Sequence, residues 1–167
     1  MTDRHLPAMR FSVHICHESD VVVVRQRARE LAREQALPAA RAEALAIAVT
    51  EIACNIVAHA RDGVVLLGTV LDESRRGVVV IARDAGPGIE QIEQAMVDGY
   101  STGNGLGFGL PGARRLVDDF EIESHVGTGT TVTLRQWVQS IALPRTDGLA
   151  CENDAVARAL SLAPPPK

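Results

Sequence analysis

The stretch that decides the fold reads Val78-Val79-Val80-Ile81-Ala82-Arg83-Asp84-Ala85-Gly86-Pro87-Gly88. Its apolar first half is typical of a buried strand, and its glycine- and proline-rich second half is typical of a loop that ends the strand. Glycine in that loop permits unusual backbone angles and the close approach of a planar ligand. The Asp84 carboxylate can accept a hydrogen bond from an exocyclic amino group, although an ordinary strand-exit turn explains the same residues.

Hydrophobic periodicity on both sides of this stretch predicts further strands and helices. The strands that we expect are residues 9–15, 64–71, 78–83, 120–124 and 130–138. The helices that we expect are residues 19–34, 38–60, 89–97 and 110–118, with Pro111 in the first turn of the last. The second and third strands should form a hairpin through a linker at residues 72–77. We therefore expect an α+β fold, a two-layer α/β sandwich whose helices cover one face of a mixed, mostly antiparallel sheet.

The two long helices carry their apolar residues at helical spacing, so each should bury one face. The first should begin at a cap formed by Ser19 or Asp20, and the second is opened by Pro38. The residues expected to face the core are Val21, Val24, Ala28 and Leu31 in the first helix and Leu45, Val49, Ile52 and Ile56 in the second.

The amino-acid composition excludes several kinds of site. The chain has 167 residues, and its one lysine is Lys167. A Walker A loop and a eukaryotic-type protein kinase both place a lysine on the phosphates, and Schiff-base chemistry needs a lysine amine. These mechanisms are therefore excluded from the body of the chain.

Charge, aromatic content and cysteine spacing limit the kinds of partner and site that the protein can have. The net charge is −4 and the aromatic content is 3%, which argues against a nucleic-acid surface. The three cysteines have no close-paired spacing, so neither a disulfide framework nor a zinc site is suggested. The start lacks a signal-peptide pattern, and no apolar run approaches the length of a membrane span. We expect a cytoplasmic protein that binds neither nucleic acid nor a membrane.

Polar residues on the second long helix form another candidate site. Glu51 and Asn55 are four residues apart and therefore share one face of that helix. This face is offset from the apolar stripe, so both side chains can look along the edge of the core. A solvated helix face explains the pair equally simply.

A third signal is the glycine-rich run Gly103-Asn104-Gly105-Leu106-Gly107-Phe108-Gly109-Leu110, which leads into a helix. Backbone N–H groups at such a helix start can cradle phosphates without a cationic side chain. The run also contains a G-x-G-x-x-G pattern that is typical of dinucleotide-binding folds. That interpretation needs a strand directly before the glycines, whereas residues 98–102 are typical of a mobile loop that extends to residue 109.

The fourth signal is the turn Gly127-Thr128-Gly129-Thr130-Thr131. A hairpin turn explains these residues fully. The Thr130 hydroxyl could also be offered to a nucleobase.

Taken together and in this order, the four signals resemble the nucleotide site of the GHKL ATPase/kinase superfamily, whose ATP-binding domain is called the Bergerat fold. Within it, residues 98–102, 105–112 and 114–120 are most similar to the RsbT-type switch kinases. The resemblance covers roughly residues 9–138. It implies a GHKL ATPase/kinase domain over residues 1–138, followed by a flexible C-terminal tail over residues 139–167.

The resemblance also implies roles for individual residues. Glu51 matches the glutamate that orients or deprotonates the attacking hydroxyl, and Asn55 matches the Mg²⁺ ligand. Asp84 matches the aspartate that accepts from the adenine amino group. The other residues implied in ATP binding are Gly86 and Gly88 beside the base, Gly105, Gly107, Gly109 and Leu110 under the phosphates, and Thr130 near adenine.

The resemblance implies a serine/threonine protein kinase that uses ATP and Mg²⁺. Such kinases phosphorylate a STAS-domain antagonist on its stressosome scaffold, in a bacterial partner-switching stress pathway. They then bind and activate a PP2C-type phosphatase. Two alternatives stay open: an anti-sigma factor kinase that sequesters a sigma factor, and a GHKL binding module whose use of ATP is vestigial. A sensor histidine kinase is disfavoured, because no helical hairpin with a phospho-accepting histidine precedes the ATP domain.

Overall fold

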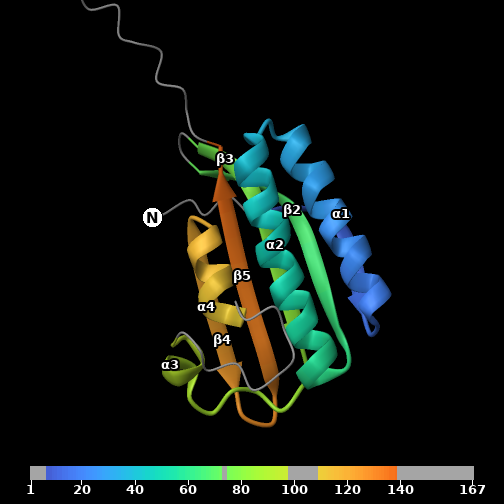
Figure 1. Cartoon of the computed structure of the whole chain (residues 1–167), viewed down its shortest axis with the longest axis vertical. Coiled ribbons are helices and arrows are strands. Elements are labelled where there is room, and N and C mark those ends of the chain that lie inside the picture. Colours follow the sequence, from blue (N-terminus) through green and yellow to red (C-terminus); the bar gives the residue numbers. More distant parts are fainter. Residues whose placement is uncertain (1–6, 73–74, 98–108, 139–167) are drawn as a thin grey trace, which may run out of the picture.

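The computed structural model describes residues 7–72, 75–97 and 109–138. These residues form two layers, with α1, α2 and α4 lying over one face of a single sheet (Figure 1). The predicted α+β sandwich is therefore confirmed.

The sheet has the strand order β1-β2-β3-β5-β4, so the strand of the opening stretch lies at its centre. The strands are β1 (Ala8–Ile15), β2 (Gly63–Asp72), β3 (Arg75–Asp84), β4 (Asp119–His125) and β5 (Gly129–Trp137). Every pairing between described strands is antiparallel. The β2–β3 hairpin is confirmed, but its linker is shorter than expected, because the strands continue to the pair Asp72 and Arg75. These two side chains also form an ion pair of 2.8 Å.

The helices follow the predicted positions with different ends. They are α1 (Glu18–Glu34), α2 (Ala39–Asn55), the π-helix η1 (Ile56–Ala60), α3 (Ile92–Ala95) and α4 (Gly109–Leu116). The stretch predicted as a helix at residues 89–97 thus holds one short helix, and the final helix ends two residues early. Pro111 lies in the first turn of α4, as expected for a residue whose missing N–H costs nothing there.

The start of α1 differs from the prediction by two or three residues. His17, rather than Ser19 or Asp20, is the N-cap residue. Asp20 lies within the first turn, and its Oδ2 accepts hydrogen bonds from the backbone N–H groups of Cys16 and His17, both at 2.9 Å. These two bonds hold the pKa of Asp20 below its ordinary value.

The core lies between the helices and the central strands. All eight residues of the two predicted apolar stripes are buried, which confirms both helix faces. They pack with the helix-facing side chains of β3, namely Val78, Val80 and Ala82. Burial of apolar surface of this kind contributes about 25 cal/mol per Å², so this shared core holds the two long helices on the sheet.

The second long helix changes its winding just after Asn55. Residues Ile56–Ala60 form the π-helix η1, which ends at Arg61 in the left-handed region with φ 66°. The Arg61 N–H donates to the Ile56 carbonyl over 2.7 Å. The π-helix is rare in proteins, and the single π-helical turns that do occur are frequently found at functional sites.

The helical segment Ala39–Ala60, which joins α2 and η1, is strongly apolar. In the described part of the chain, Ala39–Ala60 is long and apolar enough to cross a membrane by length and composition. The expectation that no apolar run reaches that length is therefore wrong. Half of the most apolar window is buried inside the fold, and a core helix of a soluble protein meets the same criterion.

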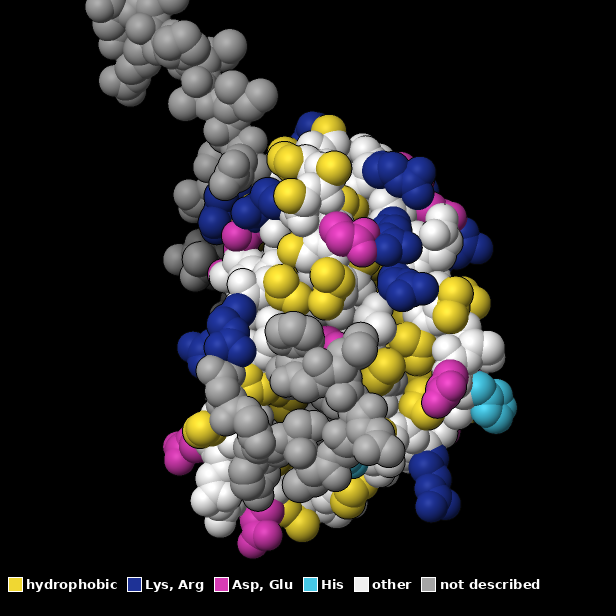
Figure 2. Space-filling view, in the orientation of Figure 1, with side chains coloured by type: hydrophobic (Ala, Val, Ile, Leu, Met, Phe, Trp, Pro, Cys, Tyr) yellow, Lys and Arg dark blue, Asp and Glu magenta, His cyan; other side chains and the backbone are white. Residues whose placement is uncertain are grey.

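The helix-covered face carries a concentration of positive charge. Figure 2 shows Arg side chains, with a few Asp and Glu side chains among them, gathered over the upper part of this face, where α1 ends and α2 begins. Arg29 on α1 joins Glu43 on α2 through two hydrogen bonds, of 3.0 and 2.7 Å. These bonds hold the pKa of Glu43 below its ordinary value. Exposed pairs of this kind add little stability, so the packing of the two helices depends mainly on their buried faces.

Two predictions concern residues outside the described ranges. The loop predicted at residues 98–109 is described at Gly109 alone, which begins α4. The tail predicted at residues 139–167 lies wholly outside them.

Candidate functional site

Helix α2 carries the first two candidate residues near its C-terminal end. Glu51 is buried, with 6% of its surface exposed, and Asn55 is half-buried at the last position of the helix. Four residues correspond to about 6 Å along a helix axis. The two side chains therefore occupy successive turns of one face, and the simple interpretation as a solvated face does not hold for Glu51.

The Glu51 carboxylate points at the start of α4. Its Oε2 accepts a hydrogen bond of 3.1 Å from the backbone N–H of Gly109. Gly109 has φ +48°, a backbone conformation that favours glycine, and it is the first residue of α4. The first N–H groups of a helix lack partners within the helix and attract negative charge. The contact thus places a buried carboxylate beside a ready anion-binding terminus.

The loop after β3 is anchored by one oxygen of Asp84. Asp84 Oδ1 accepts from the backbone N–H of Gly86 at 2.9 Å and from that of Thr130 at 3.3 Å. Among the described residues, Oδ2 takes no such bond. One carboxylate oxygen therefore holds the loop against β5, while the other can accept from a ligand.

The same loop packs closely against the β4–β5 turn. A Cβ atom at Gly88, where φ is +74°, would lie 2.2 Å from the His125 carbonyl oxygen, and one at Gly129 would lie 2.0 Å from the Asp84 carbonyl oxygen. Pro87 accepts a hydrogen bond from the Gly127 N–H at 2.8 Å. Glycine is required at these positions because backbone strands approach too closely for any side chain.

Thr130 lies inside this cluster, paired in register with Asp84 on one side and Ser124 on the other. Its hydroxyl is 2.8 Å from that of Ser124. Ser124 Oγ in turn accepts from the Ile89 N–H at 2.8 Å. Sequence reasoning missed Ser124. The pairing of the two strands across the turn at residues 126–129 is the signal that could have found it.

The end of the long helix joins these two groups of residues. A Cβ atom at Gly86 would lie 2.7 Å from the Ala60 Cβ, so the loop after β3 touches η1 directly. The continuous segment from Glu51 to Ala60 therefore runs from the start of α4 to the Asp84 loop. We call the set Glu51, Asn55, Asp84, Gly86, Gly88, Gly109, Leu110 and Thr130 the candidate site.

Most of the residues proposed from the sequence are thus placed along connected elements. Leu110 is 9% exposed at the first turn of α4. Gly105 and Gly107 lie outside the described residues.

The aspartates that follow α4 serve the fold rather than the site. Asp118 Oδ2 accepts from the Trp137 backbone N–H at 2.7 Å, and it also pairs with Arg41. Asp119 Oδ2 accepts from the Trp137 indole N–H at 2.7 Å. This part of the segment that suggested the family therefore ties the start of α2 to the edge of the sheet.

Comparison with known proteins identifies the family of the chain. The family model described as "Histidine kinase-like ATPase domain" matches residues 17–136. The protein called serine/threonine-protein kinase RsbT from Bacillus subtilis (strain 168) is 39% identical over 127 residues, which are 76% of this chain and 96% of that protein. The matched region contains every residue of the candidate site. The chain therefore belongs to the histidine kinase-like ATPase family and, within it, to the RsbT-type serine/threonine-protein kinases.

Proposed function

We propose that the protein transfers the γ-phosphoryl group of ATP to a serine or threonine of a STAS-domain antagonist in a bacterial partner-switching stress pathway. It then leaves this antagonist, with its stressosome scaffold, and activates a PP2C-type phosphatase. The observation that carries the proposal is the buried Glu51 carboxylate held against the start of α4. A proton acceptor is thereby placed beside the N-terminus of α4, and a helix N-terminus can bind phosphates.

The adenine end of the proposed nucleotide site is assigned to the Asp84 loop. Asp84 Oδ2 would accept from the adenine amino group, while Oδ1 keeps its bonds to Gly86 and Thr130. Gly86 and Gly88 let this loop pack against Ala60 and the His125 carbonyl oxygen, and we place both glycines beside the base, as the family resemblance implies. Thr130 would contact adenine through its hydroxyl or a water. The assignment of adenine to this loop rests on the Asp84 carboxylate, which the fold anchors through one of its two oxygens.

The phosphate end is assigned to Gly109 and Leu110 at the start of α4 and, from the family resemblance alone, to Gly105 and Gly107. Backbone N–H groups and helix polarity can hold phosphates there without a lysine. Mg²⁺ needs few protein ligands where phosphates and waters supply the rest, so the Asn55 carbonyl oxygen suffices as its ligand. When bound, Mg²⁺ would neutralise charge that develops on the phosphates.

The chemical step then follows from the position of Glu51. The serine or threonine oxygen forms a bond to the γ-phosphorus, the bond from that phosphorus to the bridging oxygen breaks, and ADP leaves. Glu51 accepts the proton of the attacking hydroxyl. Its bond to the Gly109 N–H holds the carboxylate beside the start of α4, where this hydroxyl would arrive in the proposed complex.

Two alternative functions and a cellular location complete the proposal. An anti-sigma factor kinase would use the same site but would hold a sigma factor, and a binding module would hold a partner without transfer. The 39% identity to the protein called serine/threonine-protein kinase RsbT favours the RsbT-type switch kinase. We place the protein in the cytoplasm, where ATP and the proposed partners occur.

The proposal predicts phosphorylation of a STAS-domain protein from the same cell. The purified chain, Mg-ATP and each such protein are incubated together, and phosphorylated residues are mapped by mass spectrometry. We expect one phosphoserine or phosphothreonine on the antagonist, followed by capture of a PP2C-type phosphatase by the released kinase. Asn55→Ala, which lacks the proposed Mg²⁺ ligand, should transfer little phosphate.

Other outcomes separate the alternatives. Capture of a sigma factor instead of the phosphatase would favour the anti-sigma factor. Failure of the wild-type chain to bind Mg-ATP by calorimetry would leave the binding module.

A further inference from the structure

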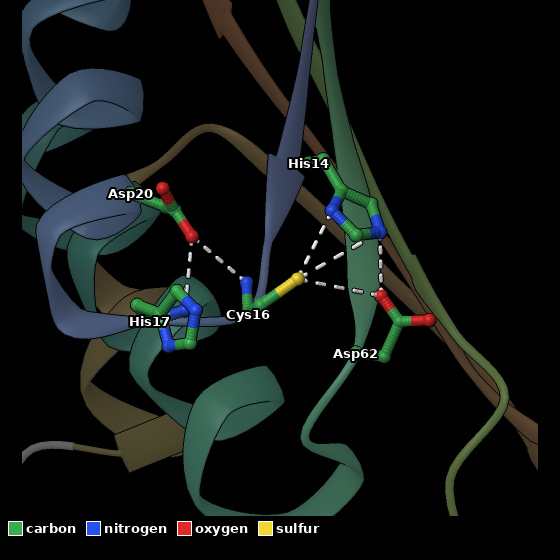
Figure 3. Close-up of polar contacts among 5 residues, drawn as sticks. All are labelled: His14, Cys16, His17, Asp20 and Asp62. Atoms are coloured by element: carbon green, nitrogen blue, oxygen red, sulfur yellow. Dashed lines mark hydrogen bonds and ion pairs between the residues drawn. The ribbon is translucent and has the colours of Figure 1, made fainter.

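A cluster of potential metal ligands lies at the corner where β1 gives way to α1. His14, Cys16 and Asp62 each offer one ligand atom, and these atoms all lie within 4.8 Å of one another. The Cys16 Sγ is 3.9 Å from His14 Nε2 and 3.8 Å from Asp62 Oδ1. His14 Nε2 is 2.6 Å from the same Asp62 oxygen. Figure 3 shows the three side chains pointing toward one another.

Strand pairing is the reason that these residues meet. In the β1–β2 register, His14 is opposite Val64 and Ile15 is opposite Gly63, so continuing by one residue sets Cys16 opposite Asp62. Side chains two residues apart on a strand share a face, which adds His14 to the same side. The strand register thus places Asp62 opposite Cys16, and strand alternation places His14 on the same side as Cys16.

The backbone around Cys16 is fixed by a neighbouring carboxylate. Asp20 Oδ2 accepts from the backbone N–H groups of Cys16 and His17, and Figure 3 shows both bonds. Asp62 follows Arg61, the left-handed residue that ends η1. The ligands therefore project from backbone that is held in place, and such support is what a preorganised metal site needs.

The donor set favours one class of metal. An imidazole nitrogen, a thiolate sulfur and a carboxylate oxygen are the ligands that Zn²⁺ takes, whereas Mg²⁺ and Ca²⁺ prefer oxygen alone. A thiolate and a carboxylate also balance the two charges of the ion. His14 and Asp62 have side-chain exposures of 66% and 71%, so an ion can reach the cluster from solvent.

We propose that His14, Cys16 and Asp62 bind a single Zn²⁺ ion, with a water molecule as the fourth ligand. The spacing of the cysteines alone suggested no zinc site, because two of these ligands are not cysteines and one is distant in sequence. The ion would clip the β1–α1 corner to the segment that follows η1. Since η1 continues α2, this end of the helix that carries Glu51 and Asn55 would gain a second attachment to the sheet.

The test uses the full chain with any affinity tag removed and with metals stripped by a chelator. Co²⁺ is titrated first, because thiolate and tetrahedral coordination give it diagnostic absorption bands, and Zn²⁺ is then added to displace it. We expect one ion per chain, a sulfur-to-cobalt charge-transfer band, and a rise in melting temperature on adding Zn²⁺. Cys16→Ser should abolish that band, and His14→Ala and Asp62→Asn should each weaken Zn²⁺ binding by about 10-fold or more.

Matched controls decide the origin of any signal. Cys54→Ser, Cys151→Ser and His59→Ala leave the three proposed ligands intact, so each should bind Co²⁺ like the wild type. Circular dichroism establishes that every variant is folded. The proposal is overturned if the wild type takes up no stoichiometric Co²⁺ or Zn²⁺, or if Cys16→Ser retains the band while Cys151→Ser loses it. An ion pair between His14 and Asp62 with a bystander thiol would produce the first of these results.

Discussion

Replacing Glu51 with glutamine is expected to lower the rate of phosphoryl transfer by about 10²–10⁴-fold, the usual contribution of a general base. Glutamine has the same shape and keeps a carbonyl oxygen that can accept from the Gly109 N–H, the bond of 3.1 Å seen here. It cannot take a proton from the attacking hydroxyl. ATP affinity should therefore stay close to that of the wild type, because α2 and α4 remain joined.

The measurement is a single-turnover assay of transfer to the protein substrate, together with calorimetry of Mg-ATP binding. Glu43→Gln is the matched control, since Glu43 lies on the same helix in an exposed pair with Arg29. That variant should transfer phosphate at the wild-type rate. Undiminished transfer by Glu51→Gln would remove Glu51 from the chemistry and leave it a purely structural link between the helices.

Replacing Asp84 with asparagine is expected to raise the Kd for ATP by about 10–100-fold, which corresponds to the loss of one charge-assisted hydrogen bond. The side-chain oxygen of asparagine can keep the contacts that Oδ1 makes with the backbone of Gly86 and Thr130. The amide nitrogen would replace Oδ2 and would face the adenine amino group, donor against donor. The loop should therefore stay folded while recognition of the base fails.

Inosine triphosphate makes this prediction specific, because its base carries a carbonyl where adenine carries the amino group. The asparagine nitrogen can donate to that carbonyl, so Asp84→Asn should bind ATP less well and inosine triphosphate better than the wild type does. Glu121→Gln, at an exposed carboxylate on β4, should change neither affinity. An equal loss for both nucleotides would mean that Asp84 supports the loop and does not touch the base.

The elements of the fold follow from short-range patterns in the sequence. The stripe of Leu45, Val49, Ile52 and Ile56 predicted the buried face of α2, because helical spacing alone determines which residues share a face. Strand alternation and the apolar run at Val78 likewise predicted the sheet. Helix ends were less accurate. The π-helical turn after Asn55 ends at Arg61 with a positive φ, which is uncommon for a residue other than glycine, so no residue type there signalled it.

The candidate site was predicted as four separate pieces, and the resemblance to a family joined them. The bond between Glu51 and Gly109 connects residues 58 positions apart, which no periodicity can reveal. Ser124 was missed because it acts only through its neighbours across β4 and β5. The glycines could be identified as loop residues, but the reason for Gly129, a carbonyl oxygen 2.0 Å from any added Cβ, appears only in three dimensions.

The scarcity of lysine is consistent with this arrangement. Positive charge for the phosphates can come from backbone N–H groups at the start of α4 and from Mg²⁺ on Asn55, so no lysine is needed. The same feature excluded the kinase folds that would otherwise compete with this family.

The most direct test of the central claim is a crystal structure of the full chain with Mg²⁺ and a non-hydrolysable ATP analogue. We predict adenine against Asp84 Oδ2, the triphosphate at the start of α4, Mg²⁺ on the Asn55 oxygen, and Glu51 facing the γ-phosphate. Nucleotide bound elsewhere, or bound with its base at α4 and its phosphates at the Asp84 loop, would contradict the proposed site.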